Sequence, residues 1–465
     1  MSGAPVERAL EAIEHALNRS AGSRPVPGNQ VTLLQDADAY RAMLEIIDSA
    51  RRWIHFENYI IRSDAVGVEF AEHLMARARA GVHVRVLYDW LGSIATRRRY
   101  WRKLRDAGVE IRAFNPPRLL DAFANVTRNH RKVLVADGAA AVTGGHCIGL
   151  EWTGADHADG QAWRDTAVAV HGPAAAMLDQ AFARTWSLSG GVLPPDQLVA
   201  EVHQAGPGAV RVIAGEPGRE RTYRVVELLS AGAIDRIWIT DAYFIAPPRL
   251  LQALRDAAED GVDVRLLVPG SSDLPLVRNL TRIGYRDLLR AGVRIWEWDG
   301  PMLHSKSAVA DMRWVRIGSS NLNPSSLFGN YELDVLVDDR DLAEAMEQQF
   351  RRDIMRSREV ARRPLRGPPR ISRVLPTALE RHRPENPEAA YRPIRGESRR
   401  RAALALRTLA GNARRSVFGP AAIILVVLGA LFLILPRATA YAFAALCVWL
   451  AAAAGREAFR RRADR

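Results

Sequence analysis

From Val31 onward, hydrophobic residues follow helical spacing and strand spacing in alternation. Helix and strand patterns alternate twice, over residues 38–52, 53–61, 66–81 and 82–90. The second helical pattern ends at Gly81, a residue that commonly terminates helices. Such alternation is typical of α/β proteins whose strands are largely buried between helices.

The second half of the chain repeats this order. Two more helix patterns alternate with two strand patterns, over residues 222–233, 236–244, 248–261 and 262–270. Even the joins agree, because RAGVHVRVL in the first half matches EDGVDVRLL in the second. We therefore predict two similar α/β lobes, residues 31–205 and 206–358, and the chain is long enough to give each a core.

Residues 1–30 form an N-terminal extension. Within it, residues 6–20 have the pattern of a short amphipathic helix, which we expect to pack on the first lobe; an arm that binds a partner is the alternative. The start has charged residues and no apolar signal core, so nothing in it predicts export. Cys147 and Cys447 lie far apart in unlike contexts, which favours a reducing compartment without disulfides.

The composition changes after Ile354. Residues 359–415 are rich in Arg and Pro and predict an extended linker. Two uncharged apolar runs follow, 417–435 and 438–455, and as helices they would each span about 27–28 Å, close to the hydrocarbon thickness of a bilayer. We predict a transmembrane helical hairpin over 416–465; a buried hairpin of a soluble protein is the alternative.

Arginines crowd the outer ends of these two runs. They are Arg399, Arg400, Arg401, Arg407, Arg414, Arg415, Arg456, Arg460, Arg461 and Arg462. The positive-inside bias predicts that both ends, and the lobes with them, lie on the cytoplasmic side of a bacterial cytoplasmic membrane. The same clusters would attract anionic lipid head groups.

The net charge of +13 comes from this C-terminal part. Residues 356–465 hold 23 arginines and 7 acidic residues, which leaves a net charge of −3 for residues 1–355. Proteins that grip a polyanion normally carry a basic stripe, so we expect no nucleic-acid partner, although a local basic groove is compatible with this average.

One short unit occurs twice. Counting from a histidine, a lysine follows at the second position, an aspartate at the seventh, and two small residues at the fourteenth and fifteenth. The two sets are His130, Lys132, Asp137, Gly144 and Gly145, and His304, Lys306, Asp311, Gly318 and Ser319. The chain has three lysines beside 62 arginines, and two of the three stand in these units, so chance is a poor explanation.

The residue types suit phosphoryl transfer. A neutral imidazole can be a nucleophile and a protonated one a general acid, so two copies allow one of each. A lysine ammonium can follow a phosphate oxygen, and on a strand it projects from the same face as a histidine two positions away. The Gly-Ser-x-Asn turn at Asn321 can cradle an anion. Core histidines beside surface lysines are the alternative.

HRKVLVAD…GG and HSKSAVAD…GSSN resemble the paired motifs of the phospholipase D superfamily, and GSSNLNPSSLFGNYEL resembles in particular its bacterial cardiolipin synthase branch. The resemblance covers residues 31–354. It implies two α/β/α sandwich lobes related by a pseudo-twofold axis, with both motifs at their shared face. It also implies a phosphatidyltransferase that acts on anionic phospholipids at a membrane and needs no cofactor or metal.

By the same resemblance, His130 attacks the phosphorus of a phospholipid diester and forms a phosphohistidine. His304 protonates the departing alcohol and then takes a proton from the incoming one. The groups expected to stabilise the negative charge on the phosphoryl oxygens are Lys132, Lys306, Gly145, Ser319, Asn321 and Asn323.

A carboxylate stands at the start of an apolar strand in each lobe, at Asp165 and at Glu332. A carboxylate bonded to the second ring nitrogen of a histidine would fix the tautomer and stabilise the imidazolium, and the resemblance implies that role. Two surface charges are the alternative. The resemblance also implies that Asp137 and Asp311, though part of the catalytic motifs, hold the motif turns rather than carry protons.

The first motif departs from the family's Gly-Gly-x-Asn at residues 144–147, which read Gly-Gly-His-Cys, so an amide donor is missing there. We expect no zinc site from His146, Cys147 and the polar residues 156–159, because the spacing is irregular and a cysteine pair is absent. The predicted function is a membrane-anchored phosphatidyltransferase. The alternatives are a hydrolytic phospholipase D or nuclease, and a catalytically silent membrane protein that binds anionic lipid.

Overall fold

The computed structural model describes residues 3–117, 127–153, 162–198 and 203–360. The predicted linker, apart from its first two residues, and the predicted transmembrane hairpin lie outside these ranges. Of the helices within them, none combines the length and the apolar character that crossing a membrane requires.

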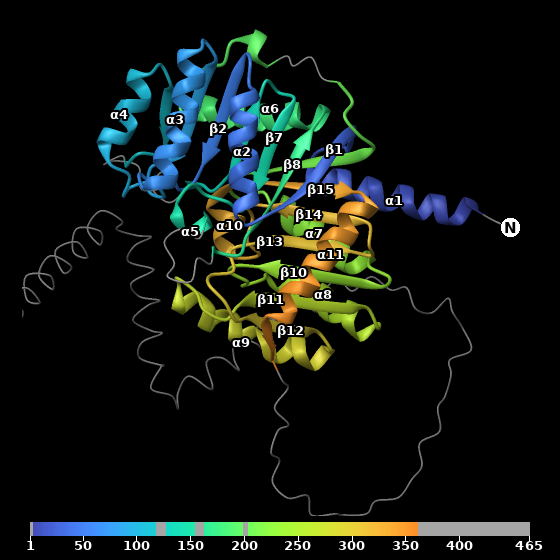
Figure 1. Ribbon diagram of the computed structural model, residues 1–465. Coiled ribbons are helices and arrows are strands. Elements are labelled where there is room, and N and C mark those ends of the chain that lie inside the picture. Colours follow the sequence, from blue (N-terminus) through green and yellow to red (C-terminus); the bar gives the residue numbers. More distant parts are fainter. Residues whose placement is uncertain (1–2, 118–126, 154–161, 199–202, 361–465) are drawn as a thin grey trace, which may run out of the picture. The chain divides into compact units, whose positions relative to one another are not determined.

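The elements follow the predicted alternation in both halves (Figure 1). The first half contains α1 (Gly3–Ala21), β1 (Val26–Gln35), α2 (Ala37–Ser49), β2 (Trp53–Asn58), α3 (Ala65–Arg79), β3 (His83–Asp89), α4 (Arg98–Asp106), β4 (Glu110–Phe114), β5 (Arg128–Asn129), β6 (Val133–Ala136), β7 (Ala140–Gly144), α5 (Leu150–Thr153), β8 (Thr166–His171), α6 (Pro173–Leu188) and a 3-10 turn (Pro195–Gln197). The second contains β9 (Gly208–Gly215), α7 (Arg221–Gly232), β10 (Arg236–Asp241), α8 (Pro248–Glu259), β11 (Asp263–Pro269), α9 (Pro275–Ala291), β12 (Arg294–Trp298), β13 (Lys306–Ala310), β14 (Trp314–Gly318), α10 (Pro324–Phe328), β15 (Asn330–Asp338), α11 (Arg340–Met355) and β16 (Ser357–Glu359).

The strands form one mixed sheet, and the predicted α/β class is confirmed. Its order is β16-β12-β11-β10-β13-β14-β15-β9-β1-β8-β7-β6-β2-β3-β4, with β5 paired to β15. The two halves meet where β1 and β9 pair antiparallel. Outward from this junction, the order is β1-β8-β7-β6-β2-β3-β4 in the first half and β9-β15-β14-β13-β10-β11-β12 in the second, so equivalent strands take equivalent places. Strands β2, β3 and β4 are parallel to one another, and so are β10, β11 and β12.

Hydrophobic packing joins the halves as well as filling each of them. One buried cluster lies under α2 and α3 in the first half, and another under α7, α8 and α9 in the second. A third cluster takes side chains from β6, β8 and α6 of the first half and from β9, β13 and α11 of the second. The described residues of both halves therefore belong to one compact unit, and the pseudo-twofold relation of two lobes stays a prediction.

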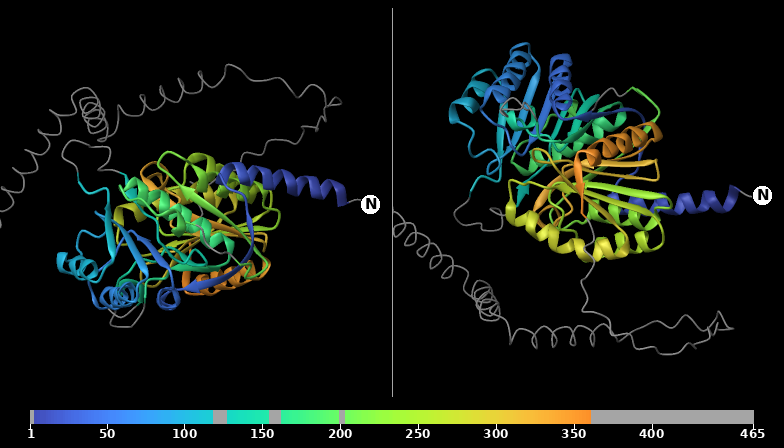
Figure 2. Two further views of the ribbon diagram at one scale, coloured as in Figure 1. Left: turned by 90° about the horizontal axis from the view of Figure 1, so that it is seen from above. Right: turned by 60° about the horizontal axis from the view of Figure 1, so that its bottom comes forward.

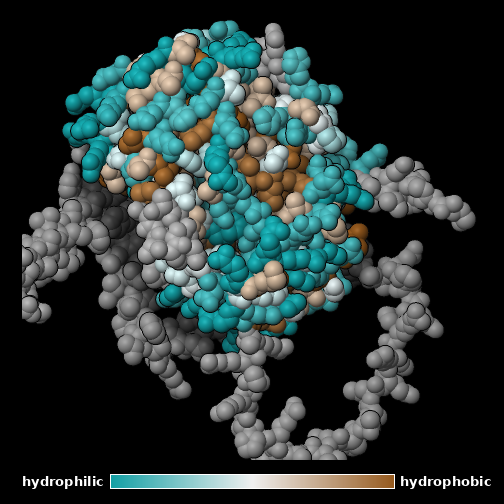
Figure 3. Space-filling model, in the orientation of Figure 1, coloured by the Kyte–Doolittle hydropathy of each residue, from teal (hydrophilic) through white to brown (hydrophobic). Residues whose placement is uncertain are grey.

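The views from above and below show helices on the outside of the strands in both halves (Figure 2). On the face shown in Figure 3, hydrophilic residues dominate and hydrophobic ones gather in separate patches. This division follows from the strands, because β2, β6, β13 and β14 are buried along their whole length and leave the solvent-facing surface to helices and loops.

The prediction for the N-terminal helix was wrong in one respect. α1 covers the predicted residues 6–20, but it packs on α7 and β9 of the second half instead of on the first lobe. Leu17 and Ala21 are fully buried in the second half's core, and Arg211 on β9 donates to Glu14 at 2.6 Å. The helical pattern specified an apolar face without specifying the surface that covers it.

Asp137 and Asp311 hold equivalent turns at the ends of β6 and β13. Both have positive φ, 54° and 50°, which aspartate tolerates better than most residues. The Asp137 carboxylate accepts the N–H groups of Arg51, Arg52 and Trp53, each at 2.8 Å. In the same way the Asp311 carboxylate accepts the N–H groups of the three residues 234–236, each at 2.9 Å. This geometry suits a structural role at the start of β2 and of β10.

We expect Asp311→Ala to lower the free energy of unfolding by about 2–4 kcal/mol, because three backbone donors lose a charged acceptor. Chemical denaturation measures this change. Asp287→Ala is the control, since Asp287 is an exposed residue whose one ion pair among the described residues is with Arg290, and we expect it to stay within about 0.5 kcal/mol. An Asp311→Ala protein of unchanged stability that has lost its activity would contradict the structural role.

Candidate active site

Each motif histidine lies where segments from the two halves run side by side. β5, just before His130, pairs in parallel with the start of β15, and His130 N–H donates to the Tyr331 carbonyl at 2.9 Å. Leu303, just before His304, forms a parallel bridge with Arg164, and His304 N–H donates to the Arg164 carbonyl at 2.8 Å. These two short bridges bring each histidine next to the other half's strand start.

The histidines and the predicted carboxylates consequently pair crosswise. His130 Nδ1 lies 3.0 and 3.1 Å from the two carboxylate oxygens of Glu332, and His304 Nδ1 lies 2.7 Å from Asp165 Oδ2. All four side chains are buried. A neutral imidazole that donates its Nδ1 proton to a carboxylate keeps an unprotonated Nε2, which is the nitrogen available for nucleophilic attack or for accepting a proton.

Both carboxylates are held by further donors. Ser319 Oγ donates to Glu332 at 2.5 Å, while Trp152 Nε1 and the Thr166 N–H donate to Asp165 at 3.1 and 2.8 Å. Buried carboxylates remain ionised when several donors compensate for lost hydration. The two acceptors are therefore fixed in place before a substrate arrives.

The two lysines lie beneath the histidines in the same arrangement. Lys132 Nζ donates to the carbonyl of His130 at 2.6 Å, and Lys306 Nζ donates to the carbonyl of His304. Both lysines are buried, and each ammonium also faces a tyrosine ring, at 5.2 Å from Tyr59 and 5.9 Å from Tyr243. An ammonium has three donors, so each lysine keeps N–H groups for a phosphate oxygen.

A cavity of about 820 Å³ opens at this junction. The first half contributes His130, Cys147 and Trp152 to its lining, and the second half contributes His304, Tyr243 and Asn321. Its volume falls in the range of small-molecule sites, and both imidazoles face it. The structure thus brings the two motifs to one cavity, as the resemblance implied.

The two predicted amide ligands differ in their contacts. Asn321 lines the cavity, and its side chain makes no hydrogen bond to the described residues, so its NH2 group is available to donate to a phosphate oxygen. Asn323 also lines the cavity, but its oxygen caps α10 by accepting the Ser326 N–H at 3.0 Å, and its nitrogen donates to the Tyr243 carbonyl at 3.1 Å. Asn321 is the better candidate for a phosphate contact.

The other predicted phosphate ligands touch the carboxylates instead. A Cβ at Gly145 would lie 2.1 Å from Asp165 Oδ1, so glycine at this position makes room for the carboxylate. Ser319 bonds Glu332 and also accepts the Leu333 N–H at 2.9 Å. Cys147 is buried in the cavity wall at the position of the family's asparagine. Within the described ranges, no group of three or more His, Cys, Asp or Glu residues could hold a metal ion.

Sequence reasoning missed the aromatic wall around the histidines. The Tyr59 ring lies edge-on to His130 with centroids 4.9 Å apart, and the Trp152 and Trp163 rings each lie 5.7 Å from His304. Such rings exclude water and restrict the imidazoles to one orientation. A signal was present, because Tyr59 and Tyr243 follow equivalent strands, β2 and β10, in the two halves of the repeat.

Burial favours neutral histidines in the free protein. It lowers the pKa of His304 to about 3, with Lys306 acting in the same direction and Asp165 opposing. Burial also lowers the pKa of His130, against the opposing charge of Glu332. For Glu332, burial favours the protonated form, but hydrogen bonds from His130 and Ser319 and the charge of Lys132 outweigh it and lower the pKa to about 2. The resting site therefore holds two ionised carboxylates and two neutral imidazoles.

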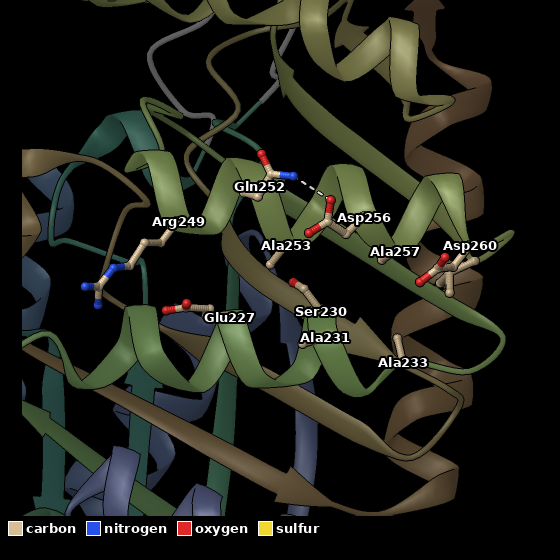
Figure 4. Close-up of a pocket in the computed structure, with 11 residues that line it drawn as sticks. Glu227, Ser230, Ala231, Ala233, Arg249, Gln252, Ala253, Asp256, Ala257 and Asp260 are labelled. Carbon is tan, nitrogen blue, oxygen red and sulfur yellow. Dashed lines mark hydrogen bonds between the residues drawn. The ribbon is translucent and has the colours of Figure 1, made fainter. Parts of the chain in front are cut away.

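A second hollow of about 500 Å³ lies between α7 and α8 on the outer face of the second half (Figure 4). Short side chains line it, together with Glu227, Arg249 and Asp256. Two of its polar residues bond to each other, because Gln252 Nε2 donates to Asp256 at 2.5 Å. It has no histidine, lysine or cysteine in its lining, and we assign it no part in the chemistry.

Comparisons with known proteins agree with this geometry. Residues 43–186 and 225–354 match a sequence family described as "Cardiolipin synthase, PLD-like domain". The chain is 35% identical over 356 residues to the cardiolipin synthase of Geobacillus sp. (strain WCH70), which covers 75% of this chain and 70% of that protein. It is 35% identical over 348 residues to cardiolipin synthase A of Pseudomonas aeruginosa, covering 74% and 71% of the two chains.

Among solved structures, phosphatidylserine synthase from Haemophilus influenzae Rd KW20 superimposes with a TM-score of 0.59. The superposition covers 75% of this chain and 92% of that one at 16% identity, so it bears on the fold alone.

The fold, the paired motifs and these matches define the class: the chain is an enzyme of the phospholipase D superfamily. Within that superfamily, it belongs to the cardiolipin synthase branch.

Proposed function

We propose that the chain transfers a phosphatidyl group from one phospholipid to another through a phosphohistidine intermediate. The observation that carries the proposal is the crosswise pairing, in which two imidazoles face one cavity and each is held through Nδ1 by a buried carboxylate of the other half. Covalent transfer needs one nucleophile and one proton donor within reach of the same phosphorus, and this arrangement supplies both.

In the first step, His130 Nε2 attacks the phosphorus of an anionic phospholipid diester. A P–N bond forms, the P–O bond to the head-group alcohol breaks, and His304 gives its proton to the departing oxygen. The bound diester brings a negative charge that offsets Lys306, which raises the pKa of His304 in the complex and allows it to carry that proton.

In the second step, the hydroxyl of a second phospholipid enters. His304 takes its proton, the oxygen attacks the phosphorus, and the P–N bond to His130 breaks. Lys132, Lys306 and Asn321 stabilise the additional negative charge on the phosphoryl oxygens in both steps. The neighbouring aromatic rings limit access of water, which favours transfer over hydrolysis.

Lipid mass spectrometry tests the function. Detergent-purified protein is incubated with phosphatidylglycerol, with and without a second phospholipid, and the products are identified. We expect cardiolipin that disappears in His130→Ala. Phosphatidic acid alone would make the chain a hydrolase, and no lipid product would direct attention to nucleic-acid substrates or to a silent lipid-binding protein.

The assignment of the nucleophile follows the family resemblance and has its own test. Radiolabelled lipid phosphate should be trapped on His130, and a His304→Ala variant should still become labelled because only proton transfer is impaired. Label on His304 in a His130→Ala variant would reverse the two roles.

The pKa of Lys306 predicts an alkaline limit to activity. Burial lowers this pKa from 10.5 to about 8, with Asp165 opposing the shift. The positive charge is therefore lost as pH rises through about 8 in the free enzyme, and kcat/KM is expected to fall about tenfold per pH unit above it. In Lys306→Arg the guanidinium stays charged, so the residual activity should lack this limb. If the fall of kcat/KM above about pH 8 persisted in Lys306→Arg, a group other than Lys306 would be responsible for it.

We also propose the membrane placement and the domain boundaries given by the sequence: an N-terminal extension at 1–30, lobes at 31–205 and 206–358 related by a pseudo-twofold axis, a linker at 359–415 and a membrane hairpin at 416–465. The repeated strand order supports the two lobes. The arginine asymmetry supports a cytoplasmic location of the lobes at a bacterial cytoplasmic membrane. Protease protection in spheroplasts and in inverted vesicles distinguishes the two sides.

A further inference from the structure

A stripe of aliphatic residues leads from the cavity onto the surface. Leu274, Val277, Leu280 and Ile283 recur at every third position at the start of α9 and along it, so each lies beside the next and the row winds around the helix by about 60° per step. Leu274 and Val277 line the cavity, whereas Leu280 and Ile283 are 44% and 74% exposed. The stripe therefore begins inside the site and continues over the outside of the protein.

One exposed apolar residue of α10 lines the same cavity, and two others stand on a loop of the first half that contacts the site. Phe328, the last residue of α10, lines the cavity and is 64% exposed. In the first half, Leu91 and Ile94 are exposed in the loop that follows β3. That loop is tied to the site, because Asp89 at its start accepts the N–H of Asn129, which directly precedes the first motif histidine, at 2.9 Å.

We define the rim as Leu91, Ile94, Leu274, Leu280, Ile283 and Phe328. These six make up half of the twelve large hydrophobic side chains that are exposed in the described ranges. Scattered single residues of this kind are ordinary on a soluble protein, but here Leu274 and Phe328 line the cavity and the other four stand on α9 or on the loop after β3, which marks a surface that is covered in use. In Figure 1, α4 lies at the upper left and α9 along the bottom of the molecule, with α5 and α10 at heights between them.

Arginines accompany the aliphatic residues on both sides of the opening. In α9, Arg278, Arg282, Arg286 and Arg290 recur at every fourth position, against a single aspartate. Arg282 bonds Glu297 at 2.7 Å, while Arg278 and Arg286 have no ion-pair partner among the described residues. In the first half, the exposed residues 97–99 are three consecutive arginines at the start of α4.

This combination points to the occupant. Leucine and isoleucine on one part of a helix with arginines beside them are characteristic of helices that lie in the interface of an anionic bilayer. A protein partner seated on the rim would close the opening through which a substrate must pass. A lipid surface would instead leave the opening facing the pool from which a phospholipid diester is drawn.

We propose that the rim docks on an anionic phospholipid bilayer, so that a lipid passes from the membrane into the cavity without crossing water. The inference rests on the proposed lipid substrate and names the part of the surface that meets the membrane. Leu280, Ile283 and Phe328 enter the head-group boundary, and the exposed Arg286 contacts lipid phosphates.

Photocrosslinking tests the contact directly and without reference to activity. The photoreactive residue p-benzoylphenylalanine replaces Ile283 in the full chain, which is reconstituted in vesicles of phosphatidylglycerol and phosphatidylcholine in equal amounts. The matched control carries it at Ile234, which is 83% exposed and stands before β10, at the end of that strand opposite to the cavity. We expect lipid adducts at 283 and few at 234.

A kinetic comparison tests the purpose of the contact. We expect Ile283→Glu to lower the ratio of turnover on bilayer phosphatidylglycerol to turnover on a monomeric short-chain analogue about tenfold, since a buried isoleucine contributes roughly that factor. Ile234→Glu should leave the ratio unchanged. Equal lipid adducts at both positions, adducts only to protein at 283, or an unchanged ratio in Ile283→Glu would overturn the proposal. Lipid adducts at 283 in the p-benzoylphenylalanine variant, together with no transfer product from the wild-type protein, would refute the proposed function alone.

Discussion

Alanine in place of either His130 or His304 is expected to lower the turnover of phosphatidylglycerol at least about 10⁴-fold. His130→Ala removes the atom that forms the P–N bond, and His304→Ala removes the group that gives and takes the proton. Initial rates from lipid mass spectrometry measure the loss, with thermal unfolding as a check that each variant is folded. Because the two groups act in one step, the double variant should be no slower than the slower single variant.

His55 provides a matched control. Its Nδ1 lies 2.6 Å from Asp179 Oδ1, and both side chains are buried, as in the two pairs of the site. The His55 ring stacks on Phe182 at 4.6 Å and does not line the cavity. We expect His55→Ala to lower the free energy of unfolding by about 2–4 kcal/mol and to leave turnover per folded molecule within about threefold. A comparable loss of turnover in His55→Ala would mean that packing, and not chemistry, explains the effect of the two site variants.

Asp165→Asn is expected to lower kcat by about 10³–10⁴-fold while changing KM little. An amide can donate its N–H to His304 Nδ1, which would move the ring proton to Nε2 and block proton acceptance there. The carboxylate is also a group that raises the pKa of His304 against burial. Its removal lowers that pKa further, so the imidazolium needed in the first step becomes harder to form.

Two further variants distinguish this loss of kcat from a general loss of structure. Glu332→Gln should reproduce it through His130, whereas Asp179→Asn, at the buried pair outside the cavity, should not. The pH profile adds a further readout, because the alkaline limb of kcat that reflects loss of the His304 proton should move to lower pH in Asp165→Asn. If Asp165→Asn raised KM and left kcat unchanged, Asp165 would act on the substrate instead of on His304.

The sequence was sufficient for the elements that carry strong periodicity. The patterns at 53–61 and 82–90 correspond to β2 and β3, and those at 236–244 and 262–270 correspond to β10 and β11, each ending slightly earlier in the structure. The strands end earlier because the chain turns into the site after them, where polar and aromatic residues break the pattern. The two-residue strand β5 is too short to have a pattern at all.

Contacts between the halves were not predictable. The sequence marked Asp165 and Glu332 as partners of the histidines, but it did not show which histidine each one contacts. Asp165 of the first half bonds His304 of the second half, and Glu332 of the second half bonds His130 of the first. The crossing depends on the parallel bridges at Leu303 and Tyr331, which are set by the packing of two distant segments. Asn323 was predicted to contact phosphate because it stands two residues after Asn321 in the second motif. In the structure its side-chain oxygen caps α10 instead.

The crosswise pairing also determines when the protein can become active during its synthesis. Glu332 follows His130 by 202 residues, and at ordinary elongation rates that stretch takes roughly 10–40 s to translate. Until it has emerged and folded, His130 lacks the acceptor that orients its ring, and Asp165 lacks the imidazole that it serves. A nascent chain on the ribosome therefore carries one complete motif without the power to cleave the membrane lipids around it, and chemical competence arises only when synthesis of the second half is nearly finished.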